Sequence, residues 1–463
     1  MSNIFSIILA AGQGVRMNSE LPKVLHEVGG KPMISHVIDG LFDINVRDIV
    51  VVVGHKSLEV INYLGSNVNY VKQEEQLGTA HAVLQARDFL FGKKGITIVI
   101  CGDSPLITSE TLKGLIKEHE AKNATATILT AELNLPSGYG RIIRDDKELV
   151  LKIVEEKEAS LEEKKIKEIN SGVYCFDNEK LFDTLPKVSN NNKKGEYYLT
   201  DIIGILKSEG ELIAAYRTND PNEIIGVNDR VVLADAERIL KERIINKHML
   251  NGVTIIDPSN TYIDKDVQIE ADTIIYPNTY LKGKTHIKSN CKIGPGADVT
   301  QAIVEKNVTI TYSVIVSSTI GENSKIGPFS YIRPGSKVGE SVKIGDFVEI
   351  KNSSIGRGTK VSHLSYIGDS DLGEEINIGC GTITVNYDGV TKNRINIGDN
   401  AFIGCNANLL APLVIGKRAC IAAGSTINDD VGDDTLAIAR ERQTNKEGYA
   451  KKIRDKQQGS SKR

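Results

Sequence analysis

The strongest constraint in this sequence is a repeat of aliphatic residues at six-residue intervals through its C-terminal half. Between residues 263 and 427, isoleucine, valine or leucine recurs in long runs, and the next residue is often glycine, as at Gly321 and Gly345. A helix has a period of 3.6 and a strand a period of two, so neither explains this spacing. A parallel β-helix does, because an inward-facing apolar residue on each side of a coil stacks on its equivalent one coil away.

The same spacing predicts where the stack is regular and where it is interrupted. The inward row is expected to resume after a first slip at Val308, Val314 and Ile320. The row slips again before Ile355, and a longer interruption covers residues 379–396, where a loop is expected to leave the stack. Loops on one face of a solenoid often carry function, but spacing alone is equally compatible with a tolerated surface insertion.

The first 228 residues have a different pattern, in which short β-branched runs alternate with helical stretches. Residues 4–9, 49–53 and 96–100 are strand-like, which predicts a mostly parallel, doubly wound α/β sheet. Residues 229–250 contain no glycine or proline and are expected to form a linker helix. The β-helix would then occupy residues 251–440, followed by a flexible basic tail at 441–463.

Composition narrows the classes of protein. With 40% hydrophobic and 25% charged residues the chain is an ordinary globular protein, and its net charge of −3 argues against a nucleic-acid binder. The six cysteines form no Cys-x-x-Cys pair and no zinc-type spacing, which favours free thiols in a reducing cytoplasm. The apolar residues 1–11 lack the basic segment of a signal peptide and are too short to insert in a membrane. We therefore expect a cytoplasmic protein.

A glycine-rich segment follows the first predicted strand. It reads Leu-Ala-Ala-Gly-Gln-Gly-Val-Arg-Met from residue 9, and Leu-Pro-Lys follows at 21–23. A dinucleotide fingerprint requires glycine where this chain has Met17, and a P-loop requires Gly-Lys-Ser/Thr, which is absent. Backbone amides at such a turn suit phosphate oxygens, and Arg16 and Lys23 would supply positive charge to a pyrophosphate leaving group. A tight strand–helix connection would explain the glycines equally well.

A carboxylate, Asp103, stands just after the strand at 96–100. Ligands of α/β sheets bind at the carboxyl ends of strands, where Asp103 could hold a Mg²⁺ that bridges phosphates. Taken alone, Asp103 would be better explained as a helix N-cap or a turn residue.

The whole glycine-rich string, with its Pro-Lys, closely resembles the signature of sugar-1-phosphate nucleotidyltransferases. The resemblance extends to residues 73–79, where the family holds uracil, and to 138–141, 168–170 and 226–228. It implies Lys23 and Arg16 as catalytic residues and Mg²⁺ bound by Asp103 and Asn228. It assigns the nucleotide sugar to Leu9, Ala10, Ala11, Gly12, Lys23, Gln73, Gly78, Thr79, Cys101, Gly102, Asp103, Gly140, Glu155, Asn170 and Asn228.

The β-helical half carries polar residues that could perform a second reaction. His363 lies in Val-Ser-His-Leu-Ser-Tyr-Ile, and imidazole is suited to act as a base near neutral pH. Arg333 and Lys351 could clamp a sugar phosphate. On spacing alone, each of these residues is more often a solvated surface side chain than a catalytic one.

The entire chain resembles the bacterial bifunctional N-acetylglucosamine-1-phosphate uridyltransferases/glucosamine-1-phosphate N-acetyltransferases. The motifs are Tyr-Ile-Arg-Pro-Gly from 331, Glu-Ile-Lys-Asn from 349, His-Leu-Ser-Tyr-Ile-Gly-Asp from 363 and Thr-Val-Asn-Tyr-Asp-Gly from 384. The resemblance implies a left-handed β-helix, a homotrimer with sites at subunit junctions, and a loop at 379–396 that reaches a neighbouring subunit. Its product, UDP-N-acetylglucosamine, would feed peptidoglycan and lipopolysaccharide synthesis.

The same resemblance implies the substrates and the residues that hold them. Acetyl passes from acetyl-CoA to glucosamine-1-phosphate, and N-acetylglucosamine-1-phosphate then reacts with UTP and releases pyrophosphate. His363 would be the base, with the amino-sugar phosphate held by Arg333, Lys351, Tyr366 and Asn377. The acetyl-CoA site would comprise Cys380, Asn386, Tyr387, Cys405, Ala423 and Arg440.

Two cysteines depart from the familiar pattern, since Cys380 replaces alanine and Cys405 replaces serine. A thiol near a thioester raises the possibility of a covalent acyl-enzyme. We expect direct transfer instead, because nothing adjacent in sequence suggests an activated thiolate. Two alternatives remain for the chain: a nucleotidyltransferase whose β-helix is structural or regulatory, and an inactive scaffold. The second would have lost Lys23 or Asp103, and both are present.

Overall fold

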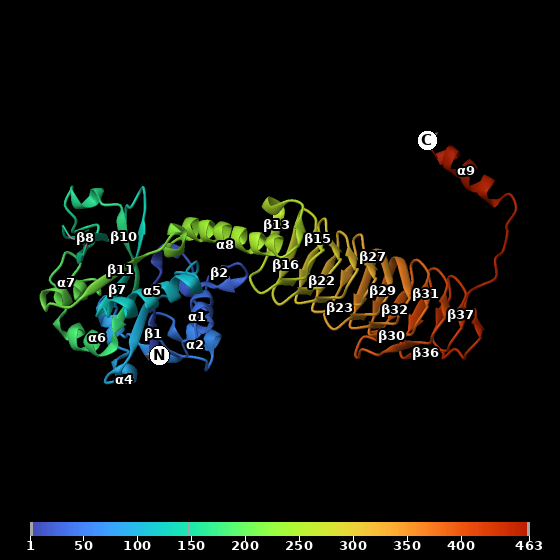
Figure 1. Ribbon diagram of the computed structural model, residues 1–463. Coiled ribbons are helices and arrows are strands. Elements are labelled where there is room, and N and C mark those ends of the chain that lie inside the picture. The colour runs from blue at the N-terminus through green and yellow to red at the C-terminus, as the bar shows by residue number, and fades with distance from the viewer. Residues whose placement is uncertain (1–2, 147–148, 461–463) are drawn as a thin grey trace. The chain divides into compact units, whose positions relative to one another are not determined.

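The structure, a computed structural model, describes residues 3–146 and 149–460. The chain divides into two compact units, the first extending to Ile244 and the second beginning at Ile245 (Figure 1). Met1, Ser2 and the last three residues of the predicted tail lie outside the described residues.

The first unit is built on a mixed sheet with the strand order β11-β7-β10-β6-β1-β4-β5. The three predicted strands are confirmed as its parallel centre: β1 (Ile4–Ala10), β4 (Asp48–Val53) and β6 (Ile96–Cys101). β10 (Glu168–Asp177) runs antiparallel to β6 and to β7 (Ala126–Glu132). β5 (Asn69–Lys72) and β11 (Ile213–Arg217) complete the row of strands, and β8 (Arg141–Arg144) pairs with β9 (Val150–Val154) at one side.

Both faces of this sheet are buried. Neighbouring residues of β1 show this, since Ile7 and Ile8 are fully buried yet belong to two different apolar clusters. This explains why the central strands read as nearly continuous aliphatic runs. The helices of the unit are α1 (Met33–Asp43), α2 (Ser57–Leu64), α3 (Thr79–Leu84), α4 (Arg87–Leu90), α5 (Ser109–Lys122), α6 (Asn178–Thr184) and α7 (Asp201–Ser208).

The predicted linker is a single helix, α8 (Arg230–Leu250), and the boundary between the two units falls within it. Its first part is attached to the first unit by side-chain hydrogen bonds. Glu237 accepts from the Gly29 amide at 2.6 Å, and Arg243 donates to the Leu106 carbonyl and to Asp220, each at 2.7 Å. In the described part of the chain, no helix is both long and apolar enough to cross a membrane.

The second unit is the predicted parallel β-helix, from β12 (Thr254–Ile255) to β39 (Leu436–Ala437). Equivalent residues of successive coils pair in register: Ile326 pairs with Ile344, and Ile344 with Val361. All three are buried, so the aliphatic repeat forms a continuous column inside the stack. The strands used below are β24 (Lys325–Ile326), β25 (Tyr331–Ile332), β27 (Lys343–Lys351), β29 (Lys360–Gly368), β31 (Asn377–Ile378), β32 (Ile383–Val385), β33 (Ile395–Ile397) and β34 (Phe402–Ile403).

The predicted inward row was wrong at Val308 and Val314. Ile310 pairs with the row residues of the adjacent coils, and Val308 is buried two residues earlier, in a second column. Val314 is 40% exposed, and its neighbour Ile315 is fully buried instead. The reason is that some sides of these coils are five residues long, as from Ile310 to Ile315, so a strict count of six drifts out of register.

The predicted interruption at residues 379–396 is narrower than expected. β32 still pairs with β29 on one side and with β35 (Asn408–Leu410) on the other, so the stack continues to Val385. The extra residues lie between β32 and β33, which begins at Ile395. In the tail predicted to be flexible, residues Tyr449–Ser460 form a helix, α9.

Candidate active sites

The glycine-rich segment of the first unit folds back on Lys23. After β1 the chain enters a short 3-10 helix, Val15–Met17, preceded by Gly14 in the left-handed conformation at φ 65°. A Cβ atom at Gly14 would lie 2.8 Å from the Cβ of Lys23, so the close approach requires glycine. This packing holds Lys23 beside the carboxyl end of β1, where ligands of α/β sheets bind.

Lys23 meets two predicted partners from distant parts of the chain. Its ammonium forms an ion pair with Asp103, which follows β6, and lies 3.2 Å from the side-chain oxygen of Asn228, which precedes α8. The Val227 amide donates to the Asp103 carbonyl at 2.9 Å and fixes the Asn228 segment there. The lysine, carboxylate and amide therefore form one cluster.

A pocket of about 300 Å³ opens beside this cluster. Gln73 is buried in it and donates to the Gly78 carbonyl at 3.2 Å. Gly78 has φ 120°, and a Cβ there would lie 2.5 Å from the Tyr197 carbonyl oxygen. Ten predicted residues line the pocket: Leu9, Ala10, Ala11, Gly12, Lys23, Gln73, Gly78, Thr79, Cys101 and Asp103. Val24, Gln76, Ala82 and Glu196 also line it and were not predicted.

The remaining predicted residues of this unit lie outside the pocket lining. Gly140 and Asn170 are joined by a backbone hydrogen bond of 2.9 Å. Glu155 accepts a hydrogen bond from Thr200 at 3.3 Å, and burial raises the pKa of its carboxyl. Gly102 donates its amide to the Leu9 carbonyl at 2.9 Å.

Arg16 and Cys101 differ in whether their side chains can react with or bind a ligand. Arg16 is exposed and makes no hydrogen bond or ion pair with any described residue, so it is available to an anionic ligand. Burial, reinforced by Asp103, raises the pKa of the Cys101 thiol to about 12. A thiol with this pKa is protonated at neutral pH and is neither a nucleophile nor a metal ligand there.

The donor set of the first unit suits a hard divalent cation. Asp103 and Asn228 offer oxygen atoms that are close enough together to contact the same Lys23 ammonium. Mg²⁺ is usually held by one or two such protein oxygens, with water and substrate phosphates completing its coordination. The residues present therefore fit the predicted Mg²⁺.

In the second unit, the register of β27 and β29 places predicted residues on neighbouring coils. Tyr331, Glu349 and Tyr366 are successive partners across β25, β27 and β29. Two residues further on, Lys351 pairs with Gly368, and the Arg333 amide donates to the Ile350 carbonyl at 2.8 Å, next to Lys351. The two predicted phosphate-binding cations are therefore one coil apart.

Each of these cations has a carboxylate partner that lies in a quoted motif but was not predicted as a site residue. Arg333 contacts Glu349 at 2.8 Å, and Lys351 contacts the buried Asp369 at 3.1 Å. Asn386, at the start of the protruding loop, also donates to Asp369. Burial opposes ionisation of Asp369, but hydrogen bonds from Asn352, Lys351 and Asn386 outweigh it and lower the pKa of this carboxyl. The network ties the loop to the predicted phosphate site.

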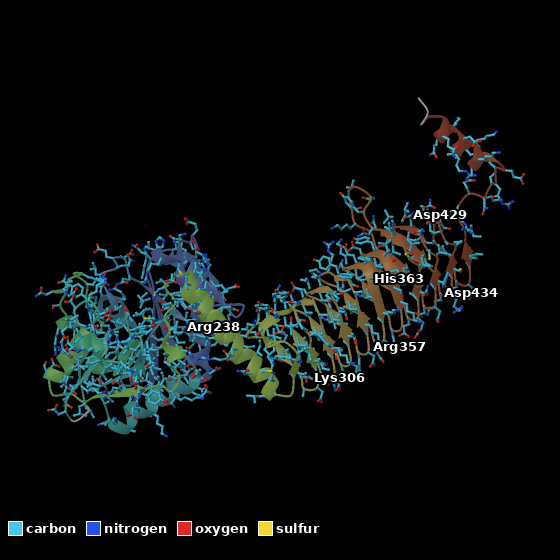
Figure 2. All side chains as sticks on the ribbon, turned by 90° about the horizontal axis from the view of Figure 1, so that it is seen from above. Arg238, Lys306, Arg357, His363, Asp429 and Asp434 are labelled. Carbon is cyan, nitrogen blue, oxygen red and sulfur yellow. The ribbon has the colours of Figure 1, made fainter. Side chains whose placement is uncertain are left out.

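His363, on the β-helix in Figure 2, has a third carboxylate partner that was also missed. Its Nδ1 lies 2.7 Å from an oxygen of Asp346, its register partner on the preceding coil. One coil here is 17 residues long, and the residue 17 positions before His363 is Asp346. The coil length could therefore have predicted this pair. Asn377 lies on the next coil, opposite Lys360, and not beside the two cations.

The predicted acetyl-CoA residues fall into smaller groups. Cys380 and Cys405 stand at the same corner of successive coils, and the amide of Asn406 donates to the Cys380 carbonyl at 2.7 Å. Arg440 donates to the Ala423 carbonyl at 2.9 Å, which joins two other predicted residues. Tyr387 is exposed on the protruding loop, where its hydroxyl donates to the Gly389 carbonyl at 2.7 Å.

Comparisons with known families match both units. The nucleotidyl transferase family matches residues 5–221, the GMPPB C-terminal domain matches residues 256–344, and the bacterial transferase hexapeptide family, with six repeats, matches residues 394–429. The first unit is therefore a nucleotidyl transferase domain, and the second contains hexapeptide repeats of a transferase type.

Curated relatives match the chain over nearly its full length. The bifunctional protein GlmU of Brevibacillus brevis is 55% identical over 453 residues, 98% of each chain. GlmU of Halalkalibacterium halodurans is 54% identical, covering 98% of this chain and 99% of the relative. GlmU of Bacillus velezensis is 54% identical over 98% of this chain and the whole of the relative. With such identity across both units, the chain belongs to the bifunctional GlmU family.

Proposed function

We propose that this protein carries out two successive steps of UDP-N-acetylglucosamine synthesis. The second unit acetylates glucosamine-1-phosphate with acetyl-CoA, and the first unit joins the product to UTP and releases pyrophosphate. The observation that carries the proposal is the presence of two separate polar clusters, one around Lys23 and Asp103 and one around His363. A purely structural β-helix would not need the charge network of Arg333, Lys351 and Asp369.

For uridylyl transfer, the pocket beside β1 holds UTP. Gln73 and the Gly78 backbone face the base, and the Gly-rich turn places its amides near the phosphates. A sugar-phosphate oxygen attacks the α-phosphorus, forms a new P–O bond and displaces pyrophosphate, whose developing charge Lys23 and Arg16 stabilise. Mg²⁺ held by Asp103 and Asn228 would neutralise phosphate charge. Glu155 and Asn170 are proposed contacts of the sugar.

For acetyl transfer, Arg333 and Lys351 hold the phosphate of the amino sugar, with Tyr366 on the adjacent coil, and Asn377, which lies apart from the two cations, is a further proposed contact of the sugar. The amine attacks the thioester carbonyl, the C–N bond forms, and the C–S bond breaks to release CoA thiolate. His363 accepts the amine proton and returns it to the thiolate. Cys380, Asn386, Tyr387, Cys405, Ala423 and Arg440 are the proposed contacts of acetyl-CoA.

The assembly proposed for this cytoplasmic protein is a homotrimer formed by the β-helix. Tyr312, Phe329 and Phe347 form a stacked aromatic column along one corner, with ring centroids 5.6 and 5.7 Å apart. Phe329 and Phe347 are 56% and 59% exposed in the single chain. Exposed apolar surface of this kind marks an interaction site, and we assign it to other copies of this chain. Partner subunits would then close the acetyltransferase site, which one chain leaves open around His363.

The two activities can be tested separately in one mixture of glucosamine-1-phosphate, acetyl-CoA, UTP and Mg²⁺. Free CoA reports acetyl transfer, and pyrophosphate formed from supplied N-acetylglucosamine-1-phosphate reports uridylyl transfer. His363→Ala should abolish only CoA release, and Asp103→Ala only pyrophosphate release. If the wild-type protein forms pyrophosphate but no CoA, the acetyltransferase half of the proposal is wrong.

A further inference from the structure

The contact between Asp346 and His363 has a defined structural origin. The two residues are register partners on β27 and β29, and Nδ1 of the imidazole lies 2.7 Å from a carboxylate oxygen. Among the residues that the structure describes, His363 makes no other side-chain hydrogen bond, so Nε2 faces no protein partner. The stacked coils therefore hold the ring by one nitrogen and leave the other open.

The chemistry of the pair determines which nitrogen carries the proton. The hydrogen bond from His363, with a contribution from the Asp346 backbone, lowers the pKa of the Asp346 carboxyl, so it is ionised near neutral pH. An ionised carboxylate can only accept hydrogen bonds. The hydrogen must then lie on Nδ1, and the lone pair of the neutral ring lies on Nε2. This is the tautomer that a base needs if Nε2 is to accept a proton from substrate.

We propose that Asp346 is a positioning residue for acetyl transfer: it fixes the Nε2-basic tautomer of His363 and stabilises the imidazolium that forms when the substrate amine is deprotonated. This inference rests on the proposed role of His363 as the base. The proton moves from the amine nitrogen to Nε2, and Asp346 keeps its charge throughout. Electrostatic support of a histidine by a carboxylate follows the general logic of histidine–carboxylate pairs.

Other groups around the pair do not supply this interaction. Lys343 on the same strand acts on Asp346 more weakly than His363 does. The strands packed against β27 and β29 contribute the titratable groups Lys325, Lys360 and Tyr331. β31 and β32 contribute no charged side chain, and Cys380 stands one coil beyond His363. None of the cationic groups can replace a carboxylate opposite Nδ1.

Two variants separate charge from orientation. Asp346→Asn keeps an oxygen that can accept from Nδ1 but removes the negative charge. The imidazolium that forms in the transition state then lacks its negative partner, so kcat for acetyl transfer should fall by about three- to tenfold, with KM for glucosamine-1-phosphate nearly unchanged. Asp346→Leu removes the partner altogether and should lower kcat by about 100-fold, with KM for glucosamine-1-phosphate nearly unchanged.

The matched control is Asp434→Asn, which removes one exposed carboxylate from an ion pair with Arg418 at 2.6 Å elsewhere on the β-helix (Figure 2). It should leave both kcat and KM for acetyl transfer at wild-type values. Pyrophosphate release by all variants should also match wild type, which shows that the first unit is folded, and unchanged light scattering shows that the β-helix still assembles. If His363→Ala retains acetyl transfer, the proposed base is wrong. If His363→Ala is inactive while both Asp346 variants keep the wild-type kcat, only the role of Asp346 is refuted.

Discussion

The two units bring their functional residues together in opposite ways. In the first unit, Lys23, Asp103 and Asn228 are far apart in sequence and meet because β1 and β6 end, and α8 begins, near the same edge of one sheet. In the second unit, Asp346, Glu349, His363 and Tyr366 meet because they lie one coil apart in a regular stack. The first arrangement encloses a pocket within one chain, whereas the second leaves its key side chains exposed. The α/β sheet thus forms its pocket within one chain, whereas we propose that partner subunits close the site on the β-helix.

The largest expected effect comes from removing those partners. Phe329→Asp combined with Phe347→Asp places charges in the aromatic column, so we expect single chains in light scattering and a loss of acetyl transfer of about 100-fold or more. Uridylyl transfer should stay within about twofold, because its pocket lies within one chain. Leu135→Asp, at an exposed position of the first unit, is the control. A trimeric double variant would refute this assignment of the interface.

A second test compares substitutions at two adjacent residues in each unit. In the β-helix only Ile315 of the pair Val314–Ile315 faces inward, so Ile315→Ala should lower the free energy of unfolding by about 2–5 kcal/mol. Val314→Ala should change it by less than about 0.5 kcal/mol. In the sheet, Ile7→Ala and Ile8→Ala should both cost about 2–5 kcal/mol, since both faces are buried. Denaturant unfolding measures all four, and a large cost at Val314 would contradict the corrected register.

The units should also respond differently to acid. His119, buried on α5, has its pKa lowered to about 4 by burial, with Asp177 acting in the opposite direction. The unfolded chain binds a proton near pH 6.5 and the folded chain does not, so the stability present above pH 6.5 is lost as the pH falls toward 4. The loss is about 3 kcal/mol for the first unit. His119→Gln should flatten that part of the stability–pH curve of the first unit and leave the unfolding of the β-helix unchanged, because His119 lies in the first unit. Denaturant unfolding at several pH values measures both.

The smallest effect is expected from replacing Cys405, which stands where the family usually has serine. Cys405→Ala should change acetyl transfer by less than about threefold, because direct transfer requires no protein nucleophile. CoA release and binding of both substrates give the measurement. Complete loss of transfer with both substrates still bound would establish a covalent step and overturn the direct mechanism.

The fold of each unit could be predicted from the sequence to the extent that it rests on a local or repeated pattern of residues. The β-helix follows from its period because each coil repeats the same burial pattern, but a strict count of six failed at Val314, where shorter sides shift the register. In the first unit, the strands at β1, β4 and β6 were predictable from their aliphatic runs. The antiparallel insertion of β10 was not, since strand order depends on long-range packing and leaves no local pattern.

The site residues of the first unit could be predicted from the sequence, whereas two carboxylates of the second unit were not. Lys23 and Asp103 could be named because they follow strands that end at one edge, and the structure brings them into contact. The carboxylates Asp346 and Asp369 were missed because the partner of each lies on another coil, and no local sequence pattern shows that contact. Their partners stand 17 or 18 residues away, and a search at the coil length rather than the six-residue side would have found them.

The protruding loop between β32 and β33 shows how freely one feature of this fold can change. Strands on both sides of it keep their parallel partners, so the stack closes whatever the length of the segment between them. Lengthening a surface loop costs only about 0.6 kcal/mol for each doubling. The exposed turn at Gly389, where nothing lies within 4 Å of an added Cβ, is therefore a place where descendants of this protein can gain or lose residues while the scaffold remains intact.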